Sequence, residues 1–521
     1  MQIRSRAVAA TSAESDPPYP SGYVFWSMTS IVLGGYISVL NVHVINIVIP
    51  IMMSDLGADV VTIRWVVTAF MMANAVVIPL VGWASRTLGA RELYILGLAV
   101  FTGSAVLCSL VSQVWLLIAL RVVQGLGGGV IMPVTMLLML DIFPVEKRGL
   151  GTAIWGMGAS CGALTGIPLG GLVTEWLSWR AAFFINLPPG LLALVIAVFV
   201  MRRSPREWGV PFDWWGFLTL STALVTLLMA LSNGQRLGWD STQIVTLFAV
   251  CGATSFAFLL IESHVSVPLI DLTTFRSPPY VIAIVLSVIA GAMFNGGPFL
   301  LSLFLQQTYD LSVWHAALIM FPSSASMVLL TSVTGWATDR IDTRVLMVLG
   351  YLCYGSFGAL MMLADLRLSL AAILFIYFGR GLGLGLSYPV LYPVGISGLP
   401  SAKGKAATTI LNLCIVLGGA LVVSLLAALL DQRHQVHQAL LAETQTLPAI
   451  GTQHGLQVFE GLAAQFEMTA EPASQARILL GRFVNQEALL LAFNDCFAVF
   501  LAISIAGIAL ALFFRRASQQ V

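Results

Sequence analysis

Three ionisable side chains lie inside long apolar stretches of this sequence, where a charge is costly. Arg121 and Arg380 are the basic residues that remain once the loops and tails have been counted. On insertion scales a buried arginine costs at least about 2.5–3.5 kcal/mol, so each must face a cavity, a partner or backbone carbonyls. His43 carries the side chain that titrates near neutral pH, which makes it a candidate proton carrier. Such groups suit the handling of protons or of a polar substrate within a membrane.

Asn41 and Asp495 join His43 and Arg121 as candidate proton-coupling groups. Asn41 and Arg121 fall at similar depth, about nine and seven residues from the outer ends of their spans, so the two can pair. An amide paired with a fixed cation can hydrogen-bond but cannot exchange a proton. Asn41 lies about 200° around the helix from His43, so these two side chains cannot share one face. Asp495 is the weaker candidate, because an acid at the edge of a span is usually solvated.

Two of these groups also have purely structural interpretations. Arg121 could merely lock two helices together, and His43 could be a packing histidine that is bonded to a neighbouring helix. The sequence alone leaves both alternatives open.

The composition is that of a helical membrane protein. Charged residues make up 9% of the 521 residues and hydrophobic ones 58%, whereas soluble domains have about 25% charged residues. Apolar runs of about 20 residues recur along the chain, each long enough to cross a bilayer. No basic patch could hold a nucleic acid. The six cysteines stand singly, without metal or redox spacing. We therefore expect an all-α, multi-pass membrane protein with no metal and no cofactor.

Hydropathy predicts fourteen spans, and the loop charges orient them. Of the 25 basic residues, sixteen fall on tails and alternate loops of one side and seven on the other, so both termini should face the cytoplasm. The expected spans are 24–48, 60–83, 91–111, 113–139, 149–173, 180–201, 212–232, 242–262, 279–307, 312–336, 344–364, 368–393, 401–430 and 490–514.

Two stretches of the chain repeat each other. Gly125-Leu-Gly-Gly-Gly, which reaches Pro133, returns 256 residues later as Gly381-Leu-Gly-Leu-Gly, which reaches Pro389. Two equivalent halves can rock about a site between them, as secondary transporters do. The offset exceeds the length of six spans by about two helices. This predicts a polar, disordered cytoplasmic tail (1–22), a six-helix bundle (23–205), two inserted helices (206–265), a second six-helix bundle (266–516) with an external loop (431–489), and a short tail (517–521). Within that loop, helical spacing predicts an amphipathic helix over 471–491.

Several local motifs resemble one transporter family. They are Leu40-Asn41-x4-Asn46-x2-Ile49-Pro50, Arg121-x2-Gln124-Gly125, Trp179-Arg180-x2-Phe183-Phe184-Ile185-Asn186-Leu187-Pro188-x-Gly190, and Pro268-Leu269-Ile270-Asp271-Leu272 with Phe275-Arg276. Together they resemble the major facilitator superfamily, and specifically its fourteen-helix drug:proton antiporters of the EmrB/QacA type, nearest to the EmrB branch. The resemblance implies the facilitator fold with two pseudo-twofold related halves.

Three positions depart from that family's pattern. The acid of its first helix is Asn41 here. The loop between its second and third helices usually has an Asp where this chain has Arg86. The proline of its antiporter motif in the fifth helix, Pro168, stands one place late. Without this acid, proton coupling would need another residue.

The resemblance also assigns a seal and a latch. The antiporter motif would seal the bundle against leak, with ordinary helix packing as the alternative, and it comprises Gly166, Pro168, Gly170 and Gly171. A cytoplasmic latch would hold helix ends together in one state, with a solvated basic cluster as the alternative, and it comprises Gly82, Arg86, Gly89, Arg91, Asp339 and Arg340. Because Arg86 replaces an acid, the first-half latch needs another anion, such as a lipid headgroup or a helix C-terminus.

These observations predict an exporter. The resemblance implies proton-driven efflux of hydrophobic and amphiphilic toxic compounds from the cytoplasm across the bacterial inner membrane, with a periplasmic adaptor protein and an outer-membrane channel as partners. Alternatives are a dedicated exporter of a siderophore or lipid-like metabolite with weak or no proton coupling, and a membrane scaffold or sensor that transports nothing. The sequence gives no sign of an enzyme. Candidate residues for the substrate cavity are Asn46, Gln124, Asn295, Gln306, Gln307, Arg380, Tyr388 and Asn412.

Overall fold

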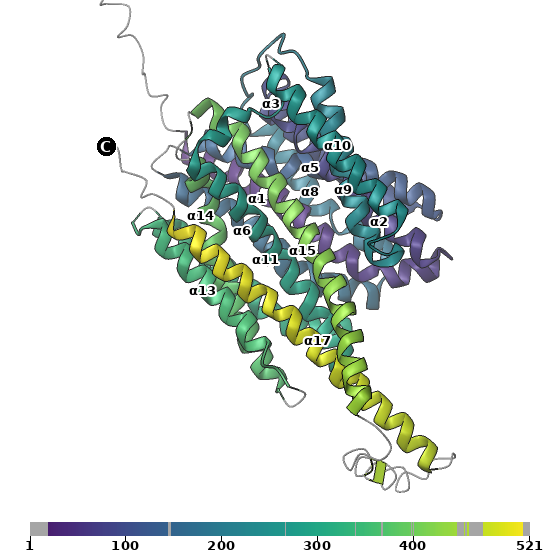
Figure 1. Cartoon of the computed structure of the whole chain (residues 1–521). Helices are drawn as coiled ribbons and strands as arrows, with labels where there is room; N and C mark the ends of the chain where they lie inside the picture. The colour runs from purple at the N-terminus through teal and green to yellow at the C-terminus, as the bar shows by residue number, and fades with distance from the viewer. Residues whose placement is uncertain are drawn as a thin grey trace, which may run out of the picture.

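The fold is a bundle of long helices, seen in a computed structural model (Figure 1). The structure describes residues 19–143, 147–265, 267–338, 340–365, 368–396, 399, 401–444, 453, 456–457 and 472–513. Within this part of the chain, thirteen segments are long and apolar enough to cross a membrane, and a bent pair of helices forms a fourteenth. The predicted all-α, fourteen-span architecture is confirmed.

The chain order divides the spans into six, two and six. The first six are α1 (Ser21–Asp55), α2 with α3 (Val60–Val77 and Leu80–Thr87), α4 (Ala90–Leu110), α5 (Val114–Ile142), α6 (Arg148–Trp176), and α7 with α8 (Trp179–Phe184 and Leu187–Phe199). The two inserted helices are α9 (Trp214–Leu237) and α10 (Thr242–His264). After the short 3-10 turn η2 (Leu272–Arg276) come α11 (Pro278–Thr308), α12 (Val313–Thr338), α13 (Thr343–Met361), α14 (Leu370–Ile396), α15 (Ser401–Thr444) and α17 (Pro472–Leu512).

One expected span is broken. The prediction treated 60–83 as a single helix, but α2 and α3 meet at an angle of 56°. Pro79 immediately precedes α3 and has no backbone N–H to continue the ladder of α2, so the chain bends there.

The packing of the second half repeats that of the first. In the first half α1 packs on α6 and α8, while α5 packs on α2 and α4. In the second half α11 packs on α15 and α17, while α14 packs on α12 and α13. Each helix of the first half therefore has a counterpart in the second, as the duplicated glycine motifs predict. Between the halves, α6 packs along α12.

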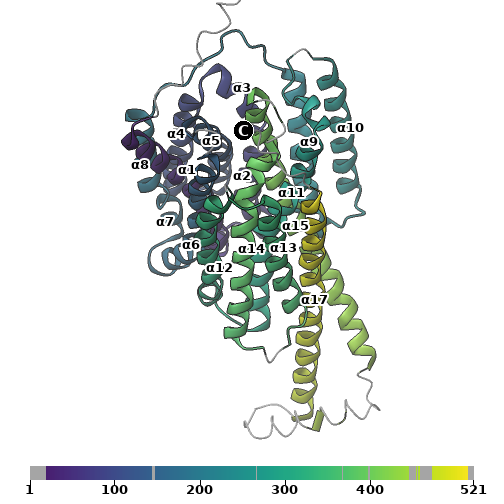
Figure 2. The same cartoon turned by 90° about the vertical axis from the view of Figure 1, so that its left-hand side faces the viewer.

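The inserted helices lie at the opposite seam between the halves. Helix α9 packs on α2 of the first half and on α15 of the second, and α10 packs on α9 (Figure 2). Leu224 of α9, for example, lies in one cluster with Ile78, directly after α2, and Leu413 of α15. Most of α10 is exposed, as expected for a helix with lipid around it.

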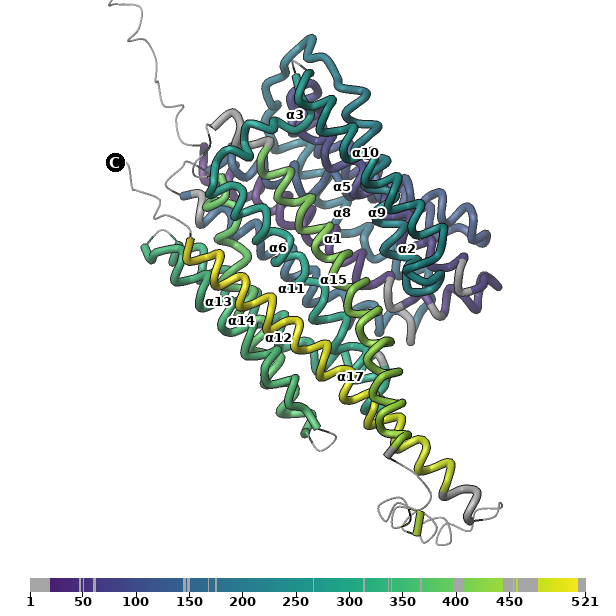
Figure 3. The backbone as a smooth tube through the Cα atoms, in the orientation of Figure 1, coloured from purple at the N-terminus to yellow at the C-terminus, as the bar shows by residue number. Residues whose placement is uncertain are grey.

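The last two long helices project beyond the bundle as an antiparallel hairpin, which the tube view follows clearly (Figure 3). The predicted external loop 431–489 differs from what is seen, because α15 continues as helix to Thr444 and α17 begins at Pro472. The amphipathic segment expected over 471–491 is helical from Pro472 onward, and it is continuous with the last span.

Candidate functional site

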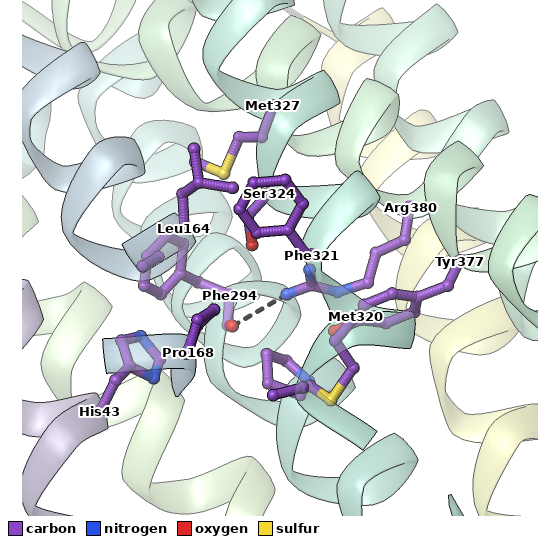
Figure 4. Close-up of a pocket in the computed structure, with 13 residues that line it drawn as sticks. His43, Leu164, Pro168, Phe294, Met320, Phe321, Ser324, Met327, Tyr377 and Arg380 are labelled. Atoms are coloured by element: carbon purple, nitrogen blue, oxygen red, sulfur yellow. Dashed lines mark hydrogen bonds between the residues drawn. The ribbon is translucent and has the colours of Figure 1, made fainter. Parts of the chain in front are cut away.

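A pocket lies where the two halves meet (Figure 4). Helices α1 and α6 of the first half and α11, α12 and α14 of the second contribute its walls. It has an empty volume of about 430 Å³, part of it open to solvent. Most of the wall is apolar and adaptable, with aromatic and thioether side chains such as Phe294, Phe321, Met320 and Met327. A lining of this kind suits a hydrophobic or amphiphilic molecule.

His43 enters the pocket from α1, and a glycine on α6 makes room for it. A Cβ atom on Gly166 would lie only 2.7 Å from the Cβ atom of His43. Gly162, one turn earlier, lies equally close to α1, because a Cβ atom there would be 2.6 Å from the carbonyl oxygen of Tyr36. Gly158 makes the same kind of approach to the carbonyl oxygen of Val32. This stripe of glycines at four-residue spacing lets the two helix backbones come close.

Arg380 enters the pocket from the opposite side, on α14. Its Nη2 donates to the backbone carbonyls of Met293 (3.2 Å) and Phe294 (3.0 Å), and its Nη1 donates to Ser323 Oγ (3.3 Å). The guanidinium also lies over the ring of Tyr377, 5.0 Å from its centroid. Although only 4% of Arg380 is exposed, its side chain forms part of the pocket wall in Figure 4. No carboxylate pairs with it among the described residues.

Arg121 lies elsewhere, sealed inside the first half. Its Nη1 donates to Asn41 Oδ1 (2.9 Å) and to Gln124 Oε1 (2.6 Å), and its Nε donates to the backbone carbonyl of Val66 (2.8 Å). The guanidinium stacks on Phe70, 4.1 Å from the ring centroid. Asn41, Gln124 and Arg121 are all buried and none lines the pocket. The structure thus places Asn41 and His43 on different sides of α1, as their spacing predicts.

The two buried arginines are not equivalent in the duplication. With the offset of 256 that relates Gly125 to Gly381, Arg380 corresponds to Gln124 and Tyr377 corresponds to Arg121. The second half therefore carries its cation one helical turn away from the position used in the first half. That shift places Arg380 at the wall of the pocket, while Arg121 stays within its own bundle.

The predicted seal motif meets the pocket at one residue. Pro168 lines the pocket, and Gly166 lies against His43 behind it. Gly171 faces Trp314 of α12, where a Cβ atom would lie 3.2 Å from the indole. Gly170 is buried within the same helix. The motif thus runs along the contact between α6 and its neighbours α1 and α12.

In the first half, two residues of the predicted latch tie α3 to the loop after α8 and α4 to the end of α8. Arg86 binds Glu207 (2.6 Å), and both side chains are about half exposed. Arg91 donates to the backbone carbonyls of Ala197 (3.2 Å) and Val198 (2.5 Å), which belong to the last turn of α8. The expected anion for Arg86 was a lipid headgroup or a helix C-terminus; in the structure a carboxylate takes that place. Arg91 is the side chain that caps a helix C-terminus.

The other latch residues are less informative. Gly89 has φ +93, a backbone conformation that favours glycine, at the tight turn into α4. Gly82 lines a second, smaller pocket with Leu269 and Ile270. Arg340 is exposed, and Asp339 lies outside the described residues.

Most of the other cavity candidates do not reach the pocket. Asn295 donates to its own helix and faces Gly419, Gln306 donates to Ser302, and Gln307 is exposed. Tyr388 is buried and does not line the pocket; its ring lies tilted against that of Phe294, with ring centroids 6.1 Å apart. Asn412 accepts a hydrogen bond from Tyr392 (2.8 Å). The side chain of Asn46 lies outside the described residues.

Asp495 does not line the pocket either; it lies between α15 and α17. Its Oδ2 lies 2.8 Å from His437 Nε2 and 3.6 Å from Arg433 Nε. This carboxylate therefore joins the two long helices to each other.

Sequence reasoning missed most of the apolar wall and the glycine stripe. Phe294, Met320, Phe321 and Met327 look like any other apolar residues of a membrane helix, so nothing in the sequence distinguishes them. The stripe had a readable signal in the four-residue spacing of Gly158, Gly162 and Gly166, a pattern typical of close helix pairs. No group of three or more potential metal ligands occurs in the part of the chain that the structure describes.

Comparison with known proteins places this geometry in context. Residues 31–423 match the family model described as Major Facilitator Superfamily. The chain is 28% identical over 442 residues to a multidrug export protein, EmrB of Haemophilus influenzae, covering 83% of this chain and 85% of the relative. It is 26% identical over 498 residues to the fatty acid resistance protein FarB of Neisseria gonorrhoeae, covering 95% and 96%.

The fold is also similar to that of a solved structure with low sequence identity. The human organic anion transporter MFSD10 superposes with a TM-score of 0.60 at 13% sequence identity, covering 95% of this chain and all of that chain. At this identity the likeness concerns the fold alone.

Proposed function

Since this chain belongs to the Major Facilitator Superfamily, we propose that it is a secondary active exporter of hydrophobic and amphiphilic toxic compounds, driven by inward proton flow and working by alternating access. Its similarity to multidrug and fatty acid resistance proteins supports export of such compounds. We further propose that it lies in the bacterial inner membrane with both termini in the cytoplasm, as the distribution of loop charge predicts.

The observation that carries the proposal is the position of the pocket. Its walls come from both halves, so a rocking motion of one half against the other would change the side from which the pocket is reached. A protein that only organised other membrane proteins would have little reason to keep a cation at the wall of such a pocket.

His43 is the proposed site of proton exchange. Among the described residues it is the histidine of the pocket wall, and an imidazole ring can take up and release a proton. Asn41 and Arg121 bind each other within the first half, where neither can exchange a proton with the pocket. We assign these two residues to holding α1 against α5.

The proposed partners are a periplasmic adaptor protein and an outer-membrane channel. The hairpin of α15 and α17 supports this part of the proposal, because it projects on the side that the loop charges place outside the cytoplasm (Figure 1). Side chains such as Leu440, Ile478 and Phe483 are exposed on it.

Proton flux driven by a hydrophobic dye, measured with an internal pH indicator in proteoliposomes, tests the function. The coupled flux of the His43→Ala variant should be at least tenfold lower than that of the wild type. The control His315→Ala, at an exposed histidine outside the pocket, should have the flux of the wild type. If His43→Ala leaves coupled flux intact, the histidine is not the proton carrier. If wild-type protein moves no dye at all, the transport proposal is wrong and a scaffold or sensor role takes its place.

A dedicated metabolite exporter with weak or no proton coupling is the second candidate. The amide at position 41 favours it, because the family's acid would stand beside Arg121 there. An Asn41→Asp variant that strengthens coupling in the same assay would show that the natural protein is a weakened antiporter. Unchanged coupling would leave the proton route with His43.

A further inference from the structure

The electrostatic character of the pocket points to a charge on the substrate. The basic residues of the pocket are His43 and Arg380, and none of the described residues that line it is Asp or Glu. A cationic amphiphile would therefore enter a positively charged pocket without a counter-ion. We propose that this exporter selects amphiphilic anions, with the anionic head bound near Arg380 and the apolar tail against the aromatic and thioether wall. This inference rests on the proposed function and adds its substrate class.

Arg380 has hydrogen-bonding capacity to spare. A guanidinium has five N–H donors, and the bonds to Met293, Phe294 and Ser323 use three of them. Of the two that remain, the buried Nε–H lies against Gly297, which leaves one N–H of Nη1 for a ligand. The three acceptors are two backbone carbonyls and one hydroxyl, so they solvate the guanidinium but leave its charge unneutralised. A buried cation in this condition is stabilised by any anion that reaches it.

Arg121 serves as an internal comparison. It is as deeply buried, but it donates to two side-chain amide oxygens and one carbonyl, and its guanidinium is closed in by Phe70. It lines no pocket, whereas Arg380 does. The first half thus keeps its arginine inside its own bundle, and the second half presents one to the central pocket.

Room for Arg380 is built into the backbone of α11. Gly297 lies against the guanidinium so closely that a Cβ atom there would collide with Nε. The turn of α11 that includes Met293 and Phe294 turns its carbonyls toward the guanidinium. Arg380 is therefore held in one orientation by α11 and α12, with its position at the wall fixed in advance of binding.

The rest of the pocket suits an apolar tail. Leu164, Phe294, Met320, Phe321 and Met327 line it. Side chains of this kind are apolar and adaptable, so they can pack against an alkyl or aromatic tail. Export of a monovalent anion from a cell that is negative inside is also favoured by the membrane potential, by about fiftyfold in the equilibrium concentration ratio for 100 mV.

Three decyl compounds of similar size but different charge test the inference. Decanesulfonate carries a fixed negative charge, decanesulfonamide is its neutral counterpart and decyltrimethylammonium is a cation. Each is tested, below its micelle-forming concentration, for inhibition of dye efflux from proteoliposomes. Wild-type protein should be half-inhibited by decanesulfonate at a concentration at least tenfold below that of either other compound. Direct flux of radiolabelled decanesulfonate should also rise when the side from which it leaves is made negative with valinomycin and a potassium gradient.

Variants at the contact between Arg380 and Ser323 separate the effect of the charge from the effect of the packing. In the Arg380→Gln variant, the concentrations of decanesulfonate and decanesulfonamide that half-inhibit dye efflux should lie within about threefold of each other. The Arg380→Lys variant should still be inhibited at lower concentration by decanesulfonate. The control Ser323→Ala removes the side-chain acceptor but keeps the charge, so it should keep the preference as well. Dye efflux without any preference for decanesulfonate in wild-type protein would overturn the inference and leave the exporter proposal standing. Absence of dye efflux would overturn both.

Discussion

At the scale of single residues, the pocket histidine owes its place to a side chain that is missing on the neighbouring helix. Gly166 has no Cβ atom, and His43 occupies the space that one would fill. An alanine at an exposed helical position normally stabilises a helix relative to glycine, by about 1 kcal/mol. At position 166 the added methyl group would instead push α1 and α6 apart.

We therefore expect Gly166→Ala to lower the free energy of unfolding by about 1–3 kcal/mol, the usual cost of overpacking. Thermal unfolding of purified protein in detergent measures the change, and dye efflux should fall with it. Gly103→Ala is the matched control, because a Cβ atom at Gly103 in α4 meets nothing within 4 Å. A Gly166→Ala protein that is as stable as the Gly103→Ala protein would contradict the packing argument.

One of the residue pairs could be predicted from the sequence, and two could not. The pairing of Asn41 with Arg121 follows from their equal depth and is seen at 2.9 Å. The meeting of His43 with Arg380 in one pocket depends on how two halves far apart in the sequence are docked, which no local pattern records. The same holds for Arg86, whose carboxylate partner Glu207 is separated from it by 121 residues.

At the scale of helices, the inserted helix α9 makes polar contacts with both halves. Its Ser232 hydroxyl lies 3.3 Å from that of Thr68 on α2, and its Gln235 donates to Asp431 on α15 (3.0 Å). One helix is therefore attached to both halves on the side of the molecule opposite the α6–α12 contact. If the halves rock, at least one of these two attachments must open.

Cysteine cross-linking tests this consequence in a background where the six native cysteines are replaced. Either link alone, 68 to 232 or 235 to 431, should leave dye efflux within about twofold, because α9 can then move with one half. Both links together should reduce efflux at least tenfold, and a reductant should restore it if a reducible reagent is used. Normal efflux from doubly linked protein would show that α9 does not restrain the halves.

Hydropathy was sufficient for the number and type of helices, because a membrane span must satisfy its backbone hydrogen bonds within itself. It was insufficient for their ends. The bend at Pro79 interrupts a uniformly apolar segment, and α15 and α17 continue into water, where helix formation depends on their contact with each other. Hydrogen bonds such as that between His434 and Asn485 (3.1 Å) make this contact.

At the scale of the whole molecule, the halves also meet on the side that the loop charges assign to the cytoplasm. Trp155, near the start of α6, packs edge-on against Tyr392, near the end of α14, with ring centroids 5.3 Å apart. Gly156 lies beside Thr331 of α12 at the same level. This contact separates the pocket from the cytoplasmic ends of the helices.

An aromatic pair of this kind contributes about 0.5–1.5 kcal/mol beyond the burial of its surface. We expect Trp155→Ala to favour opening toward the cytoplasm and to raise labelling of a cysteine at position 163, in the pocket wall, by about two- to tenfold in inside-out vesicles. A membrane-impermeant thiol reagent measures the rate. Trp208→Ala, at an exposed loop tryptophan, should leave the rate unchanged, and an equal effect of both substitutions would contradict the assignment of Trp155 to this contact.

The continuous helices of the hairpin make it a lever. From Asp431 to Thr444 the extension of α15 is about 21 Å long at 1.5 Å per residue. Both arms belong to the second half, and Asp495 with His437 clamps them together near the base. Any tilt of that half would therefore sweep the tip through a larger arc than the pocket itself travels. A protein bound to the tip would therefore be displaced in each transport cycle.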